Sequence, residues 1–301
     1  MNKFIRFLFG LSVGLVSLTV CGQVPHQKEM QASVQTNQHS NSQTKDSTND
    51  STKPQLVLHL PIQSQKLMPL AHAIQADLNS HKLAHYQVKT AVYWHDYQQG
   101  LKLGRLGVYL APPHFAAWAI HKHNFLPLVR LNQPLSYVIA ANSSDKSLFE
   151  INDLANKPIC SNKPLNLDYL LINSTFQKLA MSAIPVTVAS VTTEMKNKKS
   201  HCKAFSVSDH ILQEIAREGD SSHIRLAQGP SMRNYVLISH PQVSQQNRMA
   251  IKRYFLQKST KDLLLPIASQ FSKDGSWARA QKEDYPKSYL TQLEKYWRKS
   301  P

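Results

Sequence analysis

The residues from Arg105 to Ala111, RLGVYLA, decide the fold of this chain. They form a short and mostly apolar run, which Pro112 and Pro113 follow at once. Such a run is typical of a buried strand, and proline ends a strand but suits the first turn of a helix. The stretch therefore predicts a strand that passes directly into a helix over 114–121.

The chain before this strand shows the same alternation. Residues 56–60 (LVLHL) predict a buried strand, and apolar residues at helical spacing between 67 and 78 predict a helix. Residues 86–92 predict a second strand, and a polar helical stretch follows over 95–103. Strand, helix, strand, helix, strand is the order of a parallel α/β sheet with right-handed crossovers.

A second alternation follows two extended runs, 126–131 and 136–141. The patterns predict, in order, a short helix at 148–154, a strand at 158–160, a helix at 167–180, a strand at 186–189, a basic helix or loop at 196–199, a strand at 204–207 and a helix at 211–217. The last part predicts a strand at 235–239 and helices at 248–256, 262–271 and 289–297. Two small α/β units are thus expected in one chain.

The beginning of the chain predicts export. Basic residues precede an apolar run from Phe7 to Val20, which suits a signal peptide and is shorter than the roughly 20 residues that span a bilayer. Residues 18–22 (LTVCG) resemble the lipobox of bacterial lipoproteins, with Val20 where a small residue is usual. The resemblance implies cleavage before Cys21 and lipidation of that residue; the alternative is an ordinarily secreted chain.

The residues after this point are polar up to about residue 54. They contain no aromatic side chain and too few apolar ones to offset the entropy lost on ordering. We therefore expect a signal peptide at 1–20, and a lipidated cysteine with a disordered tether at 21–54.

Export also bears on the oxidation state that we expect for the cysteines. With Cys21 assigned to the lipid, Cys160 and Cys202 remain as an even pair in an oxidising compartment, which favours a disulfide. Two alternatives stay open: a redox or zinc site, although no C-x-x-C spacing supports one, and two unpaired buried thiols.

The charge balance favours an anionic counterpart. The chain has 35 Lys and Arg against 19 Asp and Glu, a formal net charge of +16. Export argues against nucleic acid as a partner. The anionic cell envelope and an anionic solute both remain, and the sequence does not choose between them.

Motifs of catalysis are missing from the sequence. It contains no H-E-x-x-H, no G-x-S-x-G, no P-loop and no G-x-G-x-x-G. His121 and His123 are two residues apart and so fall on different faces of a helix. We expect no enzyme activity, no metal site and no cofactor.

Three stretches resemble the phosphate/phosphonate group of substrate-binding proteins of ABC importers. They are 104–112 (GRLGVYLAP), the strand 136–141, and 149–159 (FEINDLANKPI). The resemblance extends over about 55–275 and implies an α/β fold, the two-lobed type II periplasmic-binding fold with two hinge crossovers. On this basis lobe 1 comprises 55–140 and 231–301, and lobe 2 comprises 141–230.

The same resemblance implies a ligand in the cleft, where strand carboxyl ends and helix amino termini meet. In the family, a turn rich in Ser and Thr and containing glycine holds the phosphoryl group. The corresponding turn here, 161–168 (SNKPLNLD), has no Ser-Gly pair, and Asp168 brings a negative charge to the helix end. This turn argues against a conventional phosphonate clamp.

Candidate ligand-binding residues follow the predicted strands, and their aromatic members would stack on an organic ligand. They are Tyr93, Trp94, His95, His114, Phe115, Ser161, Asn162, Asn166 and Ser208.

Two functions of different classes follow. The first is a monomeric solute-binding lipoprotein, anchored by lipid on the periplasmic side of the bacterial envelope, which delivers a small and conceivably anionic ligand to an ABC permease. The second is a binding-protein-like envelope lipoprotein without transport, acting as a sensor or an interaction module.

Overall fold

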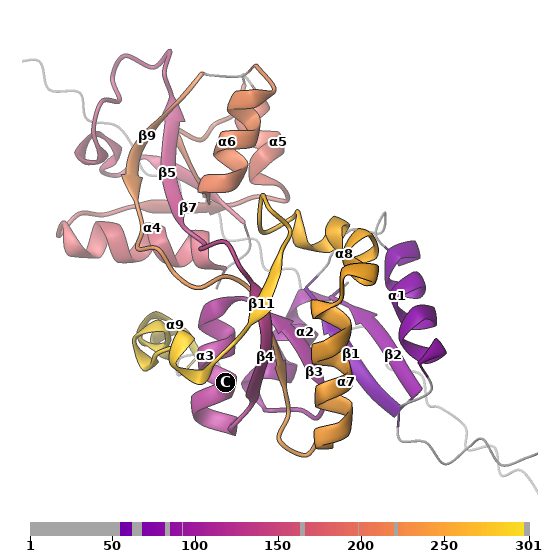
Figure 1. Ribbon diagram of the computed structural model, residues 1–301. Helices are drawn as coiled ribbons and strands as arrows, with labels where there is room; N and C mark the ends of the chain where they lie inside the picture. Colours follow the sequence, from indigo (N-terminus) through magenta and orange to yellow (C-terminus); the bar gives the residue numbers. More distant parts are fainter. Residues whose placement is uncertain are drawn as a thin grey trace, which may run out of the picture. The chain divides into compact units, whose positions relative to one another are not determined.

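A computed structural model describes residues 55–61, 68–81, 85–91, 93–162, 166–197, 199–219 and 222–297. They all belong to one compact unit, Asp50–Pro301 (Figure 1). The expected signal peptide, the lipidated Cys21 and the tether lie outside the described residues. None of the helices described is long and apolar enough to cross a membrane.

The first sheet is mixed and has six strands. They are β1 (Gln55–Leu60), β2 (His85–Thr90), β3 (Val108–Ala111), β4 (Leu126–Leu131), β10 (Val236–Ser239) and β11 (Trp277–Arg279). Their order across the sheet is β11-β4-β10-β3-β1-β2. Strand β1 pairs parallel with β2 and β3, whereas β10 runs antiparallel to both β3 and β4.

Strand β3 shows why this sheet is covered on both faces. Val108 and Leu110 belong to one core cluster, and Tyr109 and Ala111 belong to another, on the opposite face. Since all four side chains are apolar and buried, helices must pack on each side. The first face is covered by α1 (Met68–Ser80), α7 (Gln245–Leu256) and α8 (Lys261–Ala268), and the second by α2 (Trp94–Lys102), α3 (Pro113–His123) and α9 (Leu290–Trp297).

The second sheet repeats this plan with five strands. They are β5 (Tyr137–Asn142), β6 (Pro158–Ser161), β7 (Ile184–Thr187), β8 (Ala204–Ser208) and β9 (His223–Gln228), in the order β7-β6-β8-β5-β9. Strand β6 is parallel to β7 and β8, and β5 is antiparallel to β8 and β9. One face packs on α4 (Leu167–Lys178), and the other on α5 (Val191–Lys196) and α6 (Asp209–Arg217).

Short 3-10 turns complete the described chain. They are η2 (Ile151–Leu154), η3 (Lys258–Thr260), η4 (Lys282–Asp284) and η5 (Lys287–Tyr289). The expected α/β architecture with two lobes is confirmed. Two strands were not anticipated: β9, whose side chains are only partly buried, and β11, which has three residues.

Two crossovers join the sheets, at 132–136 and at 229–235. They are tied to each other at Leu135 and Met232, where each backbone N–H donates to the other residue's carbonyl oxygen at 2.9 and 2.8 Å. The lobe boundary expected after residue 140 falls inside β5. Because β5 pairs with β8 and β9 from Val138 onward, the first crossing lies before this strand.

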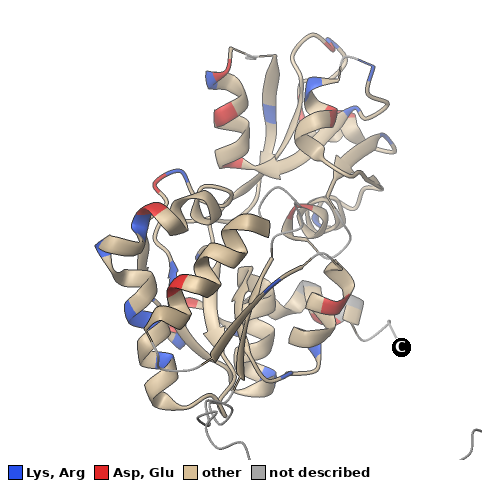
Figure 2. Ribbon diagram, turned by 90° about the vertical axis from the view of Figure 1, so that its right-hand side faces the viewer, with Lys and Arg blue, Asp and Glu red and all other residues tan. Residues whose placement is uncertain are grey.

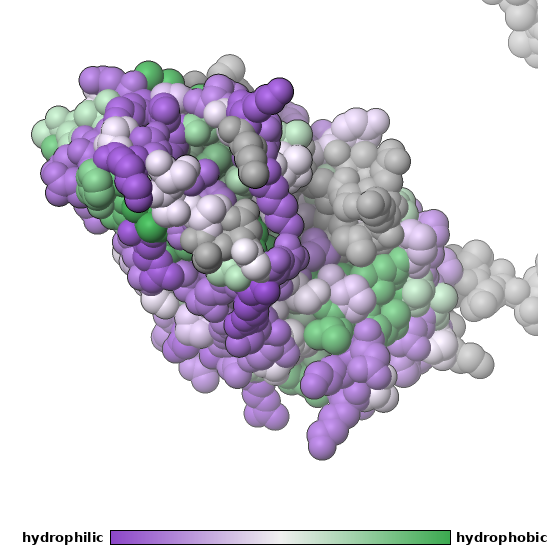
Figure 3. Space-filling model, turned by 90° about the horizontal axis from the view of Figure 1, so that it is seen from above, coloured by the Kyte–Doolittle hydropathy of each residue, from purple (hydrophilic) through white to green (hydrophobic). Residues whose placement is uncertain are grey.

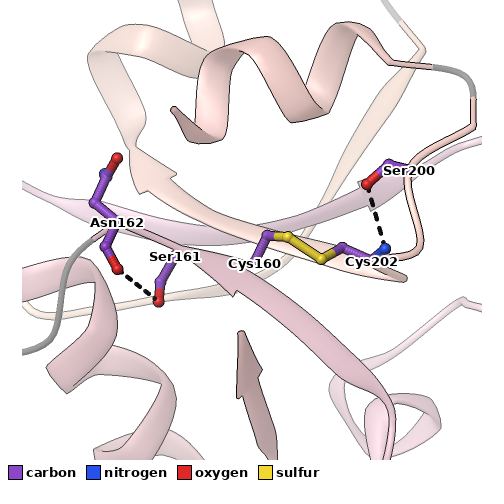
Figure 4. The surroundings of a disulfide bond; sticks show 5 residues. All are labelled: Cys160, Ser161, Asn162, Ser200 and Cys202. Atoms are coloured by element: carbon purple, nitrogen blue, oxygen red, sulfur yellow. Dashed lines mark hydrogen bonds between the residues drawn. A yellow bond between two sulfur atoms is a disulfide. The ribbon is translucent and has the colours of Figure 1, made fainter. Parts of the chain in front are cut away.

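The expected disulfide between Cys160 and Cys202 is confirmed (Figure 4). Cys160 lies in β6 and Cys202 just before β8, its neighbour in the sheet, and their Cα atoms are 5.7 Å apart. The backbone N–H of Cys202 donates to Ser200 Oγ at 3.2 Å. His201 lies beside the two sulfurs, but these are bonded to each other and are not free thiolates for a metal.

Reduction of this bond should lower stability. The bridge spans 42 positions of sequence, and closing such a loop stabilises a fold by about 4 kcal/mol in the chain-entropy model. Cys160→Ala/Cys202→Ala should therefore unfold at a lower urea concentration than the parent chain, with a larger m-value because its unfolded state is less compact. Alkylation of the native, unreduced parent protein, followed by mass spectrometry, should leave both residues unlabelled; labelling of either contradicts the assignment.

Candidate functional site

A cleft of about 330 Å³ lies where strand ends of both sheets meet. The first sheet contributes Pro61, which follows β1, and Trp94, the first residue of α2. The second sheet contributes Asn162, which follows β6, and Ser208 at the end of β8. Strand carboxyl ends and helix amino termini therefore converge here, as they do at ligand sites of open α/β sheets.

Four of the residues anticipated from the sequence line this cleft. Trp94 is almost fully buried, and its indole N–H has no hydrogen-bond partner within the described structure. Asn162 and Asn166 come from the loop between β6 and α4, and Ser208 precedes α6. The Oγ atom of Ser208 accepts the backbone N–H of Ile211 and so caps that helix.

The structure places the other five candidates outside the cleft. Tyr93 is 73% exposed, and His95 is also exposed at the start of α2. Phe115 is fully buried in the core beneath α3, where its ring stacks on Trp297 at 5.2 Å between centroids. His114 lines a separate cavity of about 280 Å³ beside leucines of α4. Ser161 is fully buried one residue before the cleft begins.

Helix α3 explains the positions of His114 and Phe115. Strand β3 does pass into a helix at Pro113, as expected, but this helix packs between the sheet, α2 and α9. The first turn of α3 is therefore buried, with Phe115 in the core and His114 at the separate cavity, and neither residue lines the cleft.

Three aromatic residues and one carboxylate of the cleft stand out among those that the sequence did not suggest as candidates. Tyr137 and Tyr235 stand at the ends of the two crossovers, Phe271 follows α8, and Asp168 is the second residue of α4. The aromatic residues come from segments that are distant in sequence, and only the folded crossovers bring them together. The sequence did contain one indication that Asp168 could line the cleft, namely its position in the first turn of the predicted helix after a strand.

Asp168 is buried, with 1% of its surface exposed, and it is anchored by several donors. Its Oδ2 atom accepts the backbone N–H and the side-chain Nδ2 of Asn162, both at 2.7 Å. The backbone N–H groups of Asp168 and Tyr169 also donate to the carboxylate. Ser206 Oγ of β8 donates to the carbonyl oxygen of Asp168 at 2.8 Å, which fixes this turn to the sheet.

Burial raises the pKa of the Asp168 carboxyl to about 6, although the hydrogen bonds from Asn162 and from the helix terminus oppose the rise. Burial also raises the pKa of Tyr137 and that of Tyr235 above the ordinary value, and the neighbouring charge of Asp168 adds to both shifts. At neutral pH the two phenols are therefore protonated and the carboxyl is mostly ionised.

Aromatic rings form much of the remaining wall. Tyr235 stacks on Phe271 with 3.9 Å between ring centroids, and Trp94 stacks on Tyr97 at 5.1 Å. Tyr137, Tyr235 and Phe271 are each partly exposed at the cleft, so they present ring surface to whatever enters it. The site can bind an organic ligand by ring contacts and hydrogen bonds.

These features define an α/β fold of two lobes with a cleft lined from both sheets. No protein-family model matches the chain, and none of the curated proteins is similar to it in sequence. Solved structures are similar in fold at about 10% sequence identity, so the resemblance noted from the sequence is confirmed at the level of fold.

Three solved structures illustrate the likeness. A Xanthomonas citri protein bound to ATP has a TM-score of 0.64 at 10% identity, covering 82% of this chain and 99% of its own. PhnD1 of Prochlorococcus marinus, in complex with methylphosphonate, has a TM-score of 0.63 at 11% identity with the same coverage. A binding-protein component of a Pseudomonas aeruginosa ABC phosphonate transporter has a TM-score of 0.61 at 10% identity, covering 77% of this chain and 83% of its own.

The raised pKa of Asp168 predicts a stability that depends on pH. The folded state holds this proton more tightly than the unfolded chain, so stability falls as pH rises from about 4 to 6 and stays lower above that window. A difference of about two pH units corresponds to roughly 3 kcal/mol. Asp168→Asn keeps an oxygen for the Asn162 donors and removes the charge, so it should raise the free energy of unfolding at pH 7.5 by roughly 1–3 kcal/mol.

Urea unfolding at pH 4.5 and pH 7.5 measures this effect. The difference between the two pH values should shrink in the variant. Asp262→Asn is the matched control, because Asp262 is the second residue of α8 but is exposed; its change should stay within about 0.5 kcal/mol. A less stable Asp168→Asn protein at pH 7.5 would contradict the assigned cost of burial.

Proposed function

We propose that this chain is a solute-binding lipoprotein of the bacterial periplasm, which captures a small ligand between its lobes and delivers it to an ABC importer. The cleft carries this proposal: a cavity of about 330 Å³, lined by strand ends of both sheets, with aromatic and polar groups together. Its volume and mixed lining are those of small-molecule sites.

The two crossovers support the same function. In the described chain the segments 132–136 and 229–235 carry the backbone between the sheets, so a change in a few backbone angles there would move one lobe against the other once contacts such as that of His210 with the Ser269 carbonyl are released. The cleft lies beside them, because Tyr137 and Tyr235 are the residues that follow the first crossover and end the second. Closure on a ligand is therefore mechanically simple in this fold.

The proposed anchor is the lipid carried by Cys21. It would hold the folded body to the membrane through the polar segment 22–54, on the periplasmic side. The face viewed in Figure 3 is largely hydrophilic, which suits a body that stands in the aqueous compartment.

A bound solute should stabilise the protein. At a concentration a hundredfold above Kd, one site adds about 2.7 kcal/mol, which for a chain of this size raises Tm by about 5–10 °C. The measurement is a thermal-shift screen of phosphonates, phosphate esters, amino acids, vitamins and organic amines.

Two substitutions test whether the solute that raises Tm binds in the cleft. Tyr235→Ala should abolish the shift given by an active solute, whereas Phe149→Ala, which removes a ring that is 73% exposed and outside the cleft, should retain it. A screen in which no solute raises Tm counts against the proposed function.

The anchor is tested separately in cells. The parent chain should sediment with membranes, and Cys21→Ala should move the folded protein to the soluble periplasmic fraction, because the acyl chains are lost. Mass spectrometry of the parent should find a diacylated or triacylated Cys21. A variant that remains membrane-bound shows that another element holds the protein there.

A further inference from the structure

The described lining of the cleft differs in charge from the chain as a whole. Among the described residues that line it, the only carboxyl is that of Asp168, and there is no Lys, Arg or His. The complete chain, by contrast, has 35 Lys and Arg against 19 Asp and Glu. The described part of the lining therefore offers an anion no cationic side chain.

The amino terminus of α4 gives an independent reason. Backbone N–H groups at such a terminus, with the positive end of the helix dipole, attract an anion. Here the carboxylate of Asp168 itself accepts those donors, together with the two donors of Asn162 at 2.7 Å. An incoming phosphonate would have to displace this carboxylate or lie against its negative charge, and both are unfavourable.

The aromatic wall attracts positive charge. Trp94, Tyr137, Tyr235 and Phe271 all border the cleft, and the face of an aromatic ring carries negative potential. A carboxylate beside several aromatic rings is an arrangement that suits ammonium ligands.

We propose that the cleft binds an organic cation, an amine or quaternary ammonium compound whose positive group lies near the Asp168 carboxylate and against the rings of Tyr235 and Phe271. This inference rests on the proposed solute-binding function and specifies the ligand's charge. It replaces the anionic solute that the net charge favours.

The positive surface does not prevent such binding. Lys and Arg are spread over many helices and loops of the body (Figure 2). Charges at the surface are screened over about 8 Å at physiological salt, whereas a buried carboxylate in the wall of a cleft is screened much less. The local charge therefore decides which ligand the cleft selects.

Titration calorimetry of the full chain at pH 8, where the Asp168 carboxyl is ionised, tests the ligand's charge with probes of matched shape. The cations are choline and benzylammonium, the neutral probes are the carbon isostere of choline and benzyl alcohol, and the anions are methylphosphonate and benzoate. At least one cation should bind tenfold or more tightly than its neutral isostere, and the anions should bind more weakly still.

The outcomes separate the two proposals. Tightest binding of methylphosphonate or benzoate overturns the cationic ligand and leaves the solute-binding function standing. Equal binding of cations and neutral isosteres also overturns it. No binding by any probe, together with no shift in the broad thermal screen, overturns both.

Substitutions then test whether Asp168 and Phe271 cause the preference for cations. Asp168→Asn should weaken cation binding at least tenfold and leave the neutral isostere unchanged, while Asp262→Asn should alter neither. Phe271→Leu should weaken the cation severalfold through loss of the ring face, with thermal unfolding confirming that the variant is folded. An Asp168→Asn protein that keeps the full preference for cations rules the proposal out.

Discussion

The central strands of the first sheet are buried on both faces, and this property constrains the structure around them. In β3, and likewise in β10, every residue is buried, so helices must cover each side of the sheet. Polar residues of the cleft lie at the ends of strands and in the first turns of helices. Asn162 and Ser208 lie at such ends, and the cleft forms where they face those of the other sheet.

Asp168 shows how the fold accommodates a charged group in such a place. Four donors surround its carboxylate, yet burial still outweighs them and raises its pKa. Perturbed carboxyls at a cleft are typical of functional sites, and the same group also holds the turn between β6 and α4 through its donors. The buried carboxylate and the cleft lining therefore support the same proposal.

Most of the fold could be predicted from local patterns, because buried strands and amphipathic helices carry a clear periodicity. The predicted strand over 126–131 matches β4 at both ends. Strand β9 was not anticipated, since its side chains are half-exposed at a sheet edge and the alternation is weak. The sequence placed the lobe boundary after residue 140, within β5, whereas the crossover precedes this strand. The position of the boundary depends on pairing between strands that are distant in sequence, which a local pattern does not contain.

The site was only partly predictable for a related reason. Trp94, Asn162 and Ser208, chosen because they follow predicted strands, do line the cleft, since their positions follow from sheet order; their role in binding stays a prediction. Phe115 was also chosen because it follows a predicted strand, but it lies in the core. The first turn of a helix faces a cleft only if no other element packs over it, and here α9, from the far end of the chain, covers Phe115. Tyr137 and Tyr235 belong to segments that only the folded crossovers bring together.

The backbone pair between Leu135 and Met232 has a mechanical consequence. Since the two crossovers are hydrogen-bonded to each other, a rotation in one of them must be matched by the other, or both bonds break. The pair therefore couples the two crossovers into one joint, in which fewer backbone angles can change independently than in two unpaired segments.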